Sequence, residues 1–207
     1  MDTSSKNLRL DWRQRLIKRS FDFFVSLFGL ICFWWLILFA FIAASIDTRS
    51  NGFFVQERIG KNAKKFSVVK IKTMRKSSNF STTVTTSDDP RITRIGSFFR
   101  KTKIDELPQL WNVFTGDMSF VGPRPDVPGF ADMLKGTDLA LLSIRPGITG
   151  PATLKYRNEE QILANKKDPE SYNRDIIFPD KVRINLEYIR NWSFKGDLQY
   201  ILNTIIK

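Results

Sequence analysis

The chain has 207 residues, about the length of one domain with a small appendage, and its formal net charge is +12. It contains no histidine and a single cysteine, Cys32, which is compatible with a reducing compartment. These counts exclude Ser-His and Cys-His nucleophile pairs, histidine-ligated metals and an internal disulfide. The positive charge indicates an anionic partner: a phosphate-rich ligand, a nucleic acid or an anionic lipid.

The first predicted element is an uncharged, aromatic-rich stretch from Phe23 to Ile46, about 24 residues, which is long enough to enter a bilayer. A buried core helix is the alternative, but such a helix normally has a polar face and this stretch has none. A cleaved signal peptide is disfavoured, because the stretch is too long for an ordinary signal core and no cleavage site accompanies it.

Basic residues flank this stretch on both sides, six before it and eight after it up to Arg75. Basic flanks favour the cytoplasmic side of a membrane, so the export of either flank is opposed. We therefore expect a basic N-terminal segment over 1–20, a re-entrant membrane-embedded helix over 21–47 and a cytoplasmic domain over 48–207.

Shorter elements follow in the cytoplasmic domain. Residues 53–60 and 64–74 predict the two strands of a β-hairpin, since the second alternates apolar and polar side chains. The Ser- and Thr-rich segment 76–89 has no apolar period and predicts a mobile loop. Residues 92–100 then predict a short helix, with three apolar side chains on one face.

Two adjacent carboxylates, Asp105 and Glu106, follow a cationic run. They open a predicted amphipathic helix, in which Asp105 suits the N-cap and Pro108 suits the first turn. The start of a helix favours a bound phosphate. In a histidine-free chain, carboxylates are the leading candidates for nucleophile, base or ligands of a hard metal such as magnesium. An ordinary helix cap has the same composition, so the pair alone does not identify a site.

Two later loops each present one arginine, Arg124 and Arg145, from a backbone that proline stiffens. A guanidinium suits bidentate contact with phosphate. An ordinary turn beside a surface arginine is the alternative for either loop alone, and their occurrence with the carboxylate pair favours a phosphate site. The predicted loop-shaping residues are Pro123, Pro125, Pro146 and Gly147.

The C-terminal segment 180–207 predicts helices in which apolar, aromatic and basic residues mix, as in a membrane-surface helix. A helix that packs on a core is the alternative. The predicted fold is α+β: a re-entrant membrane helix, then a compact, mainly helical domain with a short β-hairpin and membrane-surface amphipathic helices. Nucleic acid is not an expected partner, because the basic residues are interleaved with strands and turns and form no reading helix.

Taken together, these segments resemble the bacterial sugar transferase family, in particular its small monotopic phosphoglycosyl transferases. The resemblance covers nearly the whole chain in order, and it overturns the helix-cap interpretation of Asp105 and Glu106. The segments that carry it are Lys18-Arg19-Ser20-Phe21-Asp22, Gln56-Glu57-Arg58, Lys70-Ile71-Lys72-Thr73-Met74, Asp105-Glu106-Leu107-Pro108-Gln109-Leu110-Trp111-Asn112-Val113, Gly116-Asp117-Met118-Ser119-Phe120-Val121-Gly122-Pro123-Arg124-Pro125 and Arg145-Pro146-Gly147-Ile148-Thr149-Gly150.

The resemblance implies transfer of a sugar-1-phosphate from a nucleoside diphosphate sugar, a UDP-sugar, to polyprenyl phosphate. Asp105 would form a covalent phosphosugar–aspartyl intermediate, and Glu106 would act as metal ligand or base. Asp105 and Glu106 would hold Mg²⁺, which neutralises the diphosphate. The substrate phosphates would be bound by Arg100, Arg124 and Arg145.

The resemblance also implies a place for this reaction. The active site would lie on the cytoplasmic face of the bacterial inner (cytoplasmic) membrane, in contact with membrane lipid, and would initiate membrane-linked glycan assembly. The alternative is a non-catalytic, membrane-anchored scaffold or anionic-lipid binding protein.

The chain departs from the family pattern at three places. Trp34-Trp35 occupies the position of a Ser-Pro pair in the membrane helix, and Asn185 replaces an aspartate. Residues 151–157 differ from the family's usual sequence after Gly150, and they are expected to shape the sugar or nucleotide pocket.

Overall fold

The computed structural model describes residues 8–75 and 89–206, and this part of the chain is mostly helical with two small two-stranded sheets. The predicted loop 76–89 lies outside the described residues except for Asp89. The helices are α1 (Trp12–Thr48), α2 (Arg94–Thr102), α3 (Gln109–Thr115), α4 (Pro151–Lys155), α5 (Glu159–Ala164), α6 (Pro169–Tyr172), α7 (Phe178–Arg190) and α8 (Phe194–Ile206). The strands are β1 (Phe53–Ile59), β2 (Lys65–Ile71), β3 (Ser119–Val121) and β4 (Gly147–Thr149).

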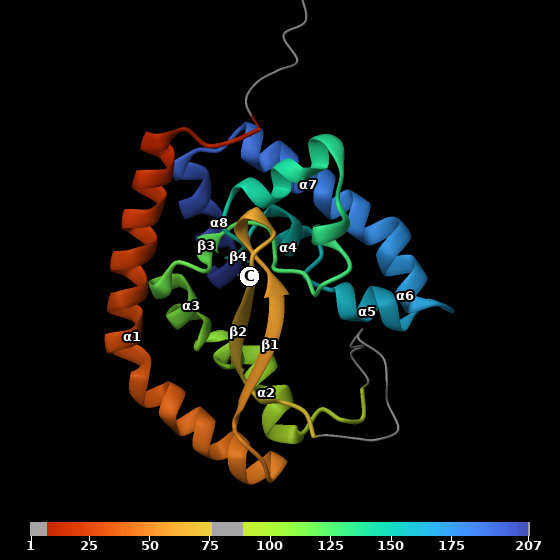
Figure 1. Ribbon diagram of the computed structural model, residues 1–207. Coiled ribbons are helices and arrows are strands. Elements are labelled where there is room, and N and C mark those ends of the chain that lie inside the picture. The colour runs from red at the N-terminus through yellow and green to blue at the C-terminus, as the bar shows by residue number, and fades with distance from the viewer. Residues whose placement is uncertain (1–7, 76–88, 207) are drawn as a thin grey trace, which may run out of the picture.

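Helix α1 is continuous over 37 residues and curves along one side of the domain (Figure 1). It begins well before residue 21, because the Asp11 side chain caps it by accepting from the Gln14 backbone. It continues through Trp34-Trp35, so no turn interrupts the predicted membrane segment. It is long and apolar enough to cross a membrane.

The two faces of α1 differ in side-chain size. Its buried positions include Ser26, Gly29 and Ala40, and a Cβ added at Gly29 would approach the Leu110 side chain to 3.1 Å. Its outward face carries large apolar side chains, of which Phe28 is 68% exposed. Small side chains therefore let α1 pack closely on the domain, while the bulky ones point away from it.

Both ends of α1 pack against the same domain. Near its N-terminal end, Lys18 Nζ lies 2.6 Å from Asp197 Oδ2 in α8. Near its C-terminal end, Ala44 packs with Ile71 of β2 and Phe99 of α2. The domain therefore fixes the positions of both ends.

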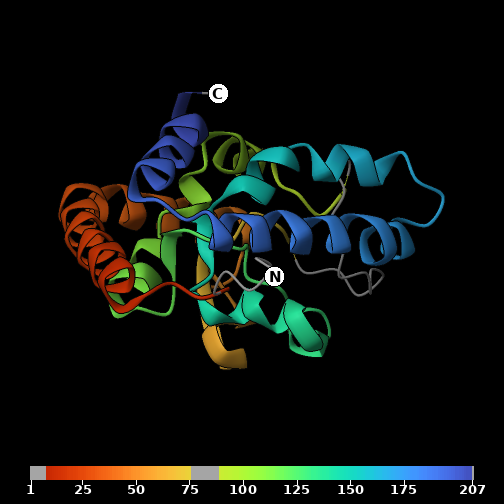
Figure 2. The same cartoon turned by 90° about the horizontal axis from the view of Figure 1, so that it is seen from above.

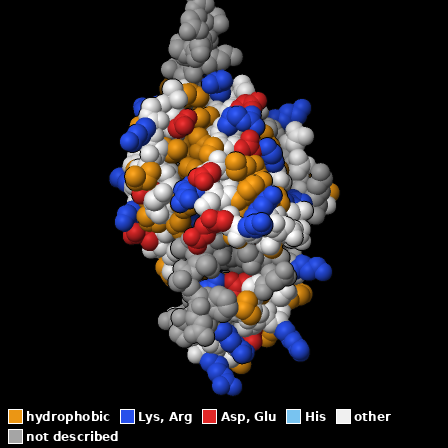
Figure 3. All heavy atoms as spheres, turned by 90° about the vertical axis from the view of Figure 1, so that its right-hand side faces the viewer, with side chains coloured by type: hydrophobic (Ala, Val, Ile, Leu, Met, Phe, Trp, Pro, Cys, Tyr) orange, Lys and Arg blue, Asp and Glu red, His pale blue; other side chains and the backbone are white. Residues whose placement is uncertain are grey.

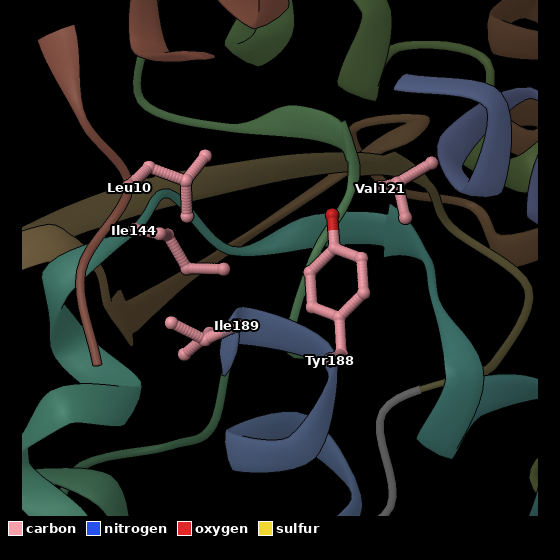
Figure 4. Packing of buried hydrophobic residues seen from close by; sticks show 5 residues of the cluster. All are labelled: Leu10, Val121, Ile144, Tyr188 and Ile189. Atoms are coloured by element: carbon pink, nitrogen blue, oxygen red, sulfur yellow. The ribbon is translucent and has the colours of Figure 1, made fainter. Parts of the chain in front are cut away.

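Strands β1 and β2 form the predicted antiparallel hairpin, with Phe54 opposite Lys70 and Gln56 opposite Val68. The parallel pair of β3 and β4 was not predicted, because each strand has three residues and three residues show no clear alternation. Val121 of β3 belongs to a buried cluster that joins the segment just before α1 to α7 (Figure 4). Its residues are Leu10, Val121, Ile144, Tyr188 and Ile189.

The predicted C-terminal helices are confirmed as α7 and α8. Seen from above, α1 lies on one side of the domain and α5 to α7 on the other (Figure 2). The face opposite α1 carries interspersed acidic and basic side chains (Figure 3). Helix α8 buries Asp197 but exposes Leu202, Ile205 and Ile206, so the molecule has a second apolar surface there.

Candidate active site

Asp105 and Glu106 lie in a 3₁₀ turn, Ile104–Glu106, between α2 and α3. The prediction that Asp105 caps the following helix is wrong: α3 begins at Gln109, and no side chain caps it. Lys103 ends α2 in the left-handed conformation, with φ 61°, and this sharp reversal leads directly into the turn. A non-glycine residue in that region is uncommon; here, as at Arg49 after α1, it ends a helix.

The two carboxylates differ in their partners. Glu106 Oε1 accepts from Lys70 Nζ at 3.2 Å and from an Arg124 Nη at 3.3 Å. Asp105 is 9% exposed, and its buried Oδ1 has no hydrogen-bond partner among the described residues. A buried polar atom without a partner is costly. Asp105 Oδ1 therefore has an unmet need for a hydrogen-bond donor or a cation, whereas Glu106 is already held by two cations.

Burial raises the pKa of Asp105 to about 6, and the charge of Glu106 adds to the rise while Lys70 opposes it. Burial alone would also raise the pKa of Glu106, but Lys70 and Arg124 outweigh it and lower that pKa to about 2. Environments that shift the pKa values of two neighbouring carboxylates in opposite directions are typical of acid–base and nucleophilic sites.

One face of the hairpin builds a pocket beside Glu106. Lys70 lies on it opposite Phe54, and Arg58 is fixed there by donating to Gln56 Oε1 at 2.6 Å and to the Pro125 carbonyl at 3.1 Å. We call this the cationic pocket. Its lining residues are Phe54, Gln56, Arg58, Val68, Lys70, Gln109, Arg124, Pro125 and Gly147.

Sequence reasoning did not identify Lys70 and Arg58 as site residues. Both were part of the family resemblance, but no role was assigned to them. The signal that could have found them is the hairpin register, which brings a cation from each strand to one face.

The three predicted phosphate contacts are not brought together. Arg124 reaches Glu106, whereas Arg100 forms an ion pair with Glu160 of α5. Arg145 instead donates from Nε to the Gly116 carbonyl at 2.6 Å, at the C-terminal end of α3. There its charge compensates the negative end of that helix.

Three of the predicted loop-shaping residues, Pro123, Pro146 and Gly147, join β3 to β4, whereas the Pro125 carbonyl accepts from Arg58. The Gly147 N–H donates to the Pro123 carbonyl at 2.8 Å, and the Ser119 N–H donates to the Pro146 carbonyl at 2.8 Å. A Cβ at Gly147 would come within 2.1 Å of the Gly122 nitrogen, so only glycine fits this crossing. These contacts hold the Arg124 loop against β4, and the Ile59 N–H of the hairpin donates to the Asp126 carbonyl on its other side at 2.9 Å.

The two carboxylates are compatible with a magnesium ion that the protein and the substrate coordinate together. The described residues contain no cluster of three acidic, cysteine or histidine side chains that could hold a metal by themselves. Magnesium is often bound by one or two carboxylates together with substrate phosphates and water. Asp105, with its unpartnered oxygen, and Glu106 supply two such carboxylates.

The departures from the family pattern are placed as follows. Pro151 occupies the first position of α4. Asn185 is buried in α7, and its Oδ1 has no partner among the described residues.

Comparison with known proteins gives consistent matches. A model of the bacterial sugar transferase family matches residues 13–207. The chain is 31% identical to the exopolysaccharide production protein ExoY of Sinorhizobium fredii, over 91% of this chain and 83% of that protein. It is 33% identical to the uncharacterized sugar transferase EpsL of Bacillus subtilis, over 93% of this chain and 87% of that protein. It is 32% identical to the UDP-glucose:undecaprenyl-phosphate glucose-1-phosphate transferase of Escherichia coli, over 93% of this chain but 40% of that protein.

Proposed function

The chain belongs to the bacterial sugar transferase family, and we propose that it transfers a sugar-1-phosphate from a nucleoside diphosphate sugar to polyprenyl phosphate, initiating membrane-linked glycan assembly. The names of two relatives, the UDP-glucose:undecaprenyl-phosphate glucose-1-phosphate transferase of Escherichia coli and the UDP-galactose-lipid carrier transferase of Erwinia amylovora, support a UDP-sugar donor and a lipid-carrier acceptor. The observation that carries the proposal is the buried, unpartnered Asp105 Oδ1, which lies beside Glu106 and the cationic pocket.

In the first step, an Asp105 oxygen attacks the β-phosphorus of the donor. A new P–O bond forms, the bond from that phosphorus to the bridging oxygen breaks, and nucleoside monophosphate leaves with the electron pair. In the second step, a phosphate oxygen of polyprenyl phosphate attacks the same phosphorus and Asp105 is released as carboxylate. The product is a polyprenyl diphosphate-linked sugar.

Glu106 has a supporting part in this scheme. Its pKa of about 2 makes it a weak base, so we assign it to holding a metal and positioning Lys70 and Arg124. In this scheme the diphosphate of the donor binds against those two cations. Magnesium held by Asp105 and Glu106 would neutralise charge on the donor's diphosphate.

The experiment that tests this function is a panel of labelled UDP-sugars incubated with membranes that contain the protein. We expect labelled lipid and free UMP with at least one donor. Asp105→Asn, which keeps the side-chain shape, should abolish UMP release, and the intact mass of the unmutated protein should rise by one phosphosugar. Substantial turnover by Asp105→Asn would contradict the nucleophile assignment, and no UMP with any donor would favour a binding protein or scaffold.

The membrane placement is part of the same proposal. We place the outward face of α1 in the bilayer, because Phe24, Phe28 and Ile31 are each at least 65% exposed. Exposure of such an apolar surface to water is unfavourable. Because both ends of α1 contact one domain, both ends stay on the cytoplasmic side, where nucleotide sugars are made. The exposed end of α8, with Ile205 and Ile206, lies on the membrane surface.

Cysteine labelling in intact cells tests this topology. The exposed residues Arg13 and Asn51, near the two ends of α1, are replaced singly by cysteine in a variant that lacks Cys32. Both sites should resist an impermeant reagent until the cells are opened. Labelling of Arg13→Cys alone in intact cells would mean that α1 crosses the membrane.

A further inference from the structure

Arg100 forms an ion pair that joins α2, which leads into the Asp105 turn, to α5. One Nη of Arg100 donates to Glu160 Oε1 at the start of α5, and the other lies 4.0 Å from the Met74 sulfur. Arg100 is also close enough to Asp105 for its charge to stabilise that carboxylate. The same guanidinium therefore acts on the Asp105 carboxylate through its charge and forms an ion pair with an acidic residue of α5.

We propose that Glu160 is a placeholder for phosphate on Arg100, and that binding of a diphosphate exchanges the carboxylate for a phosphate oxygen. The inference rests on the proposed function, which brings a diphosphate to Asp105, a carboxylate within reach of the Arg100 charge. A carboxylate and a phosphate use the same N–H donors of a guanidinium, and the phosphate carries more charge and more acceptor oxygens.

Because the pair is exposed to solvent, breaking it costs little free energy. The Arg100 and Glu160 side chains are 24% and 45% exposed. An ion pair in contact with water contributes little to stability, so a multiply charged ligand can displace it. Glu160 then turns into solvent without leaving a buried charge behind.

The neighbouring acid on α5 does not share these properties. Both carboxylate oxygens of Glu159 accept from Lys181 Nζ, at 2.7 and 2.6 Å, and the two side chains are 25% and 17% exposed. This pair anchors α5 to α7 while Glu160 moves. Glu159 therefore provides a charge-matched control on the same helix.

The test measures binding of inorganic diphosphate to the purified full chain in detergent by calorimetry. The proteins are the unmutated chain, Glu160→Gln, Arg100→Met and the double variant. Glu160→Gln should tighten binding by up to about fivefold, the factor set by the strength of a solvent-exposed ion pair. In the Arg100→Met background the same substitution should change nothing, because the two effects act through one contact. Glu159→Gln should show no such dependence on Arg100.

Several results would overturn the exchange. These are weaker binding by Glu160→Gln, an equal effect of Glu160→Gln with and without Arg100, and the absence of diphosphate binding in all proteins. Because binding does not require turnover, a protein that shows the expected cycle but transfers no sugar would refute the proposed function and keep the exchange. With an active donor, Glu160→Gln should lower KM without raising kcat.

Discussion

Replacing Asp197 by asparagine tests whether a buried ion pair fastens the start of α1 to the domain. Asp197 is 3% exposed and accepts from Lys18 Nζ at 2.6 Å, from the Tyr188 hydroxyl at 2.6 Å and from Trp192 Nε1 at 3.0 Å. Asparagine keeps the shape and one acceptor oxygen but leaves the Lys18 cation without its closest counter-charge.

The structure sets the size of the expected effect. Breaking one side of a buried ion pair costs about 3–5 kcal/mol, because an uncompensated charge remains in the interior. Asp22 is close enough to attract Lys18, which favours the lower end of that range. At about 2–4 °C per kcal/mol for a chain of this size, 3 kcal/mol corresponds to a fall in Tm of roughly 6–12 °C.

Thermal unfolding in detergent measures this loss. The double variant Lys18→Met/Asp197→Leu removes both charges and should recover part of the lost stability. The recovery is incomplete because the Tyr188 hydroxyl and Trp192 Nε1 lose their acceptor. Trp192→Phe, which removes one neutral donor, should cost only about 1 kcal/mol. A fall of less than about 2 °C for Asp197→Asn, or no recovery in the double variant, would refute the reasoning.

Four further predictions concern the site. Because Asp105 must be ionised to attack and its pKa is about 6, kcat/KM should fall as the pH drops through about 6. A value of kcat/KM that stays unchanged down to pH 4 would contradict this. Lys70→Met removes a charge that lowers this pKa, so the acidic limb should move to higher pH, which a pH–rate profile checks. EDTA should abolish UMP release and added Mg²⁺ should restore it; activity that survives thorough EDTA treatment would remove magnesium from the scheme. Gly147→Ala must displace the Gly122 backbone, so we expect a loss of at least about 3 kcal/mol, measured by thermal unfolding; an unchanged Tm would show that the crossing can open.

Local patterns in the sequence determined several parts of this protein. The alternation over 64–74 specified β2 and its hairpin, and the long uncharged run specified the apolar helix α1, since both patterns depend on neighbours a few residues apart. The family resemblance pointed to Asp105 and Glu106, and the matches with bacterial sugar transferases confirm the family.

Only the tertiary structure decided how the site is assembled. Lys70 meets Glu106 across 36 positions of sequence and Arg100 meets Glu160 across 60, and no local period reports such contacts. The same holds for Arg145, whose loop matched the phosphate-site pattern but whose side chain binds the end of α3.

The start of α3 shows the same limit on a smaller scale. Asp105 and Pro108 satisfy the composition of a helix start, yet the helix begins at Gln109, because the left-handed Lys103 and the packing of the turn direct Asp105 toward the site. Composition sets which residues are able to cap a helix or bind a phosphate. Burial and long-range charge contacts, which the folded chain alone supplies, decide which of them do.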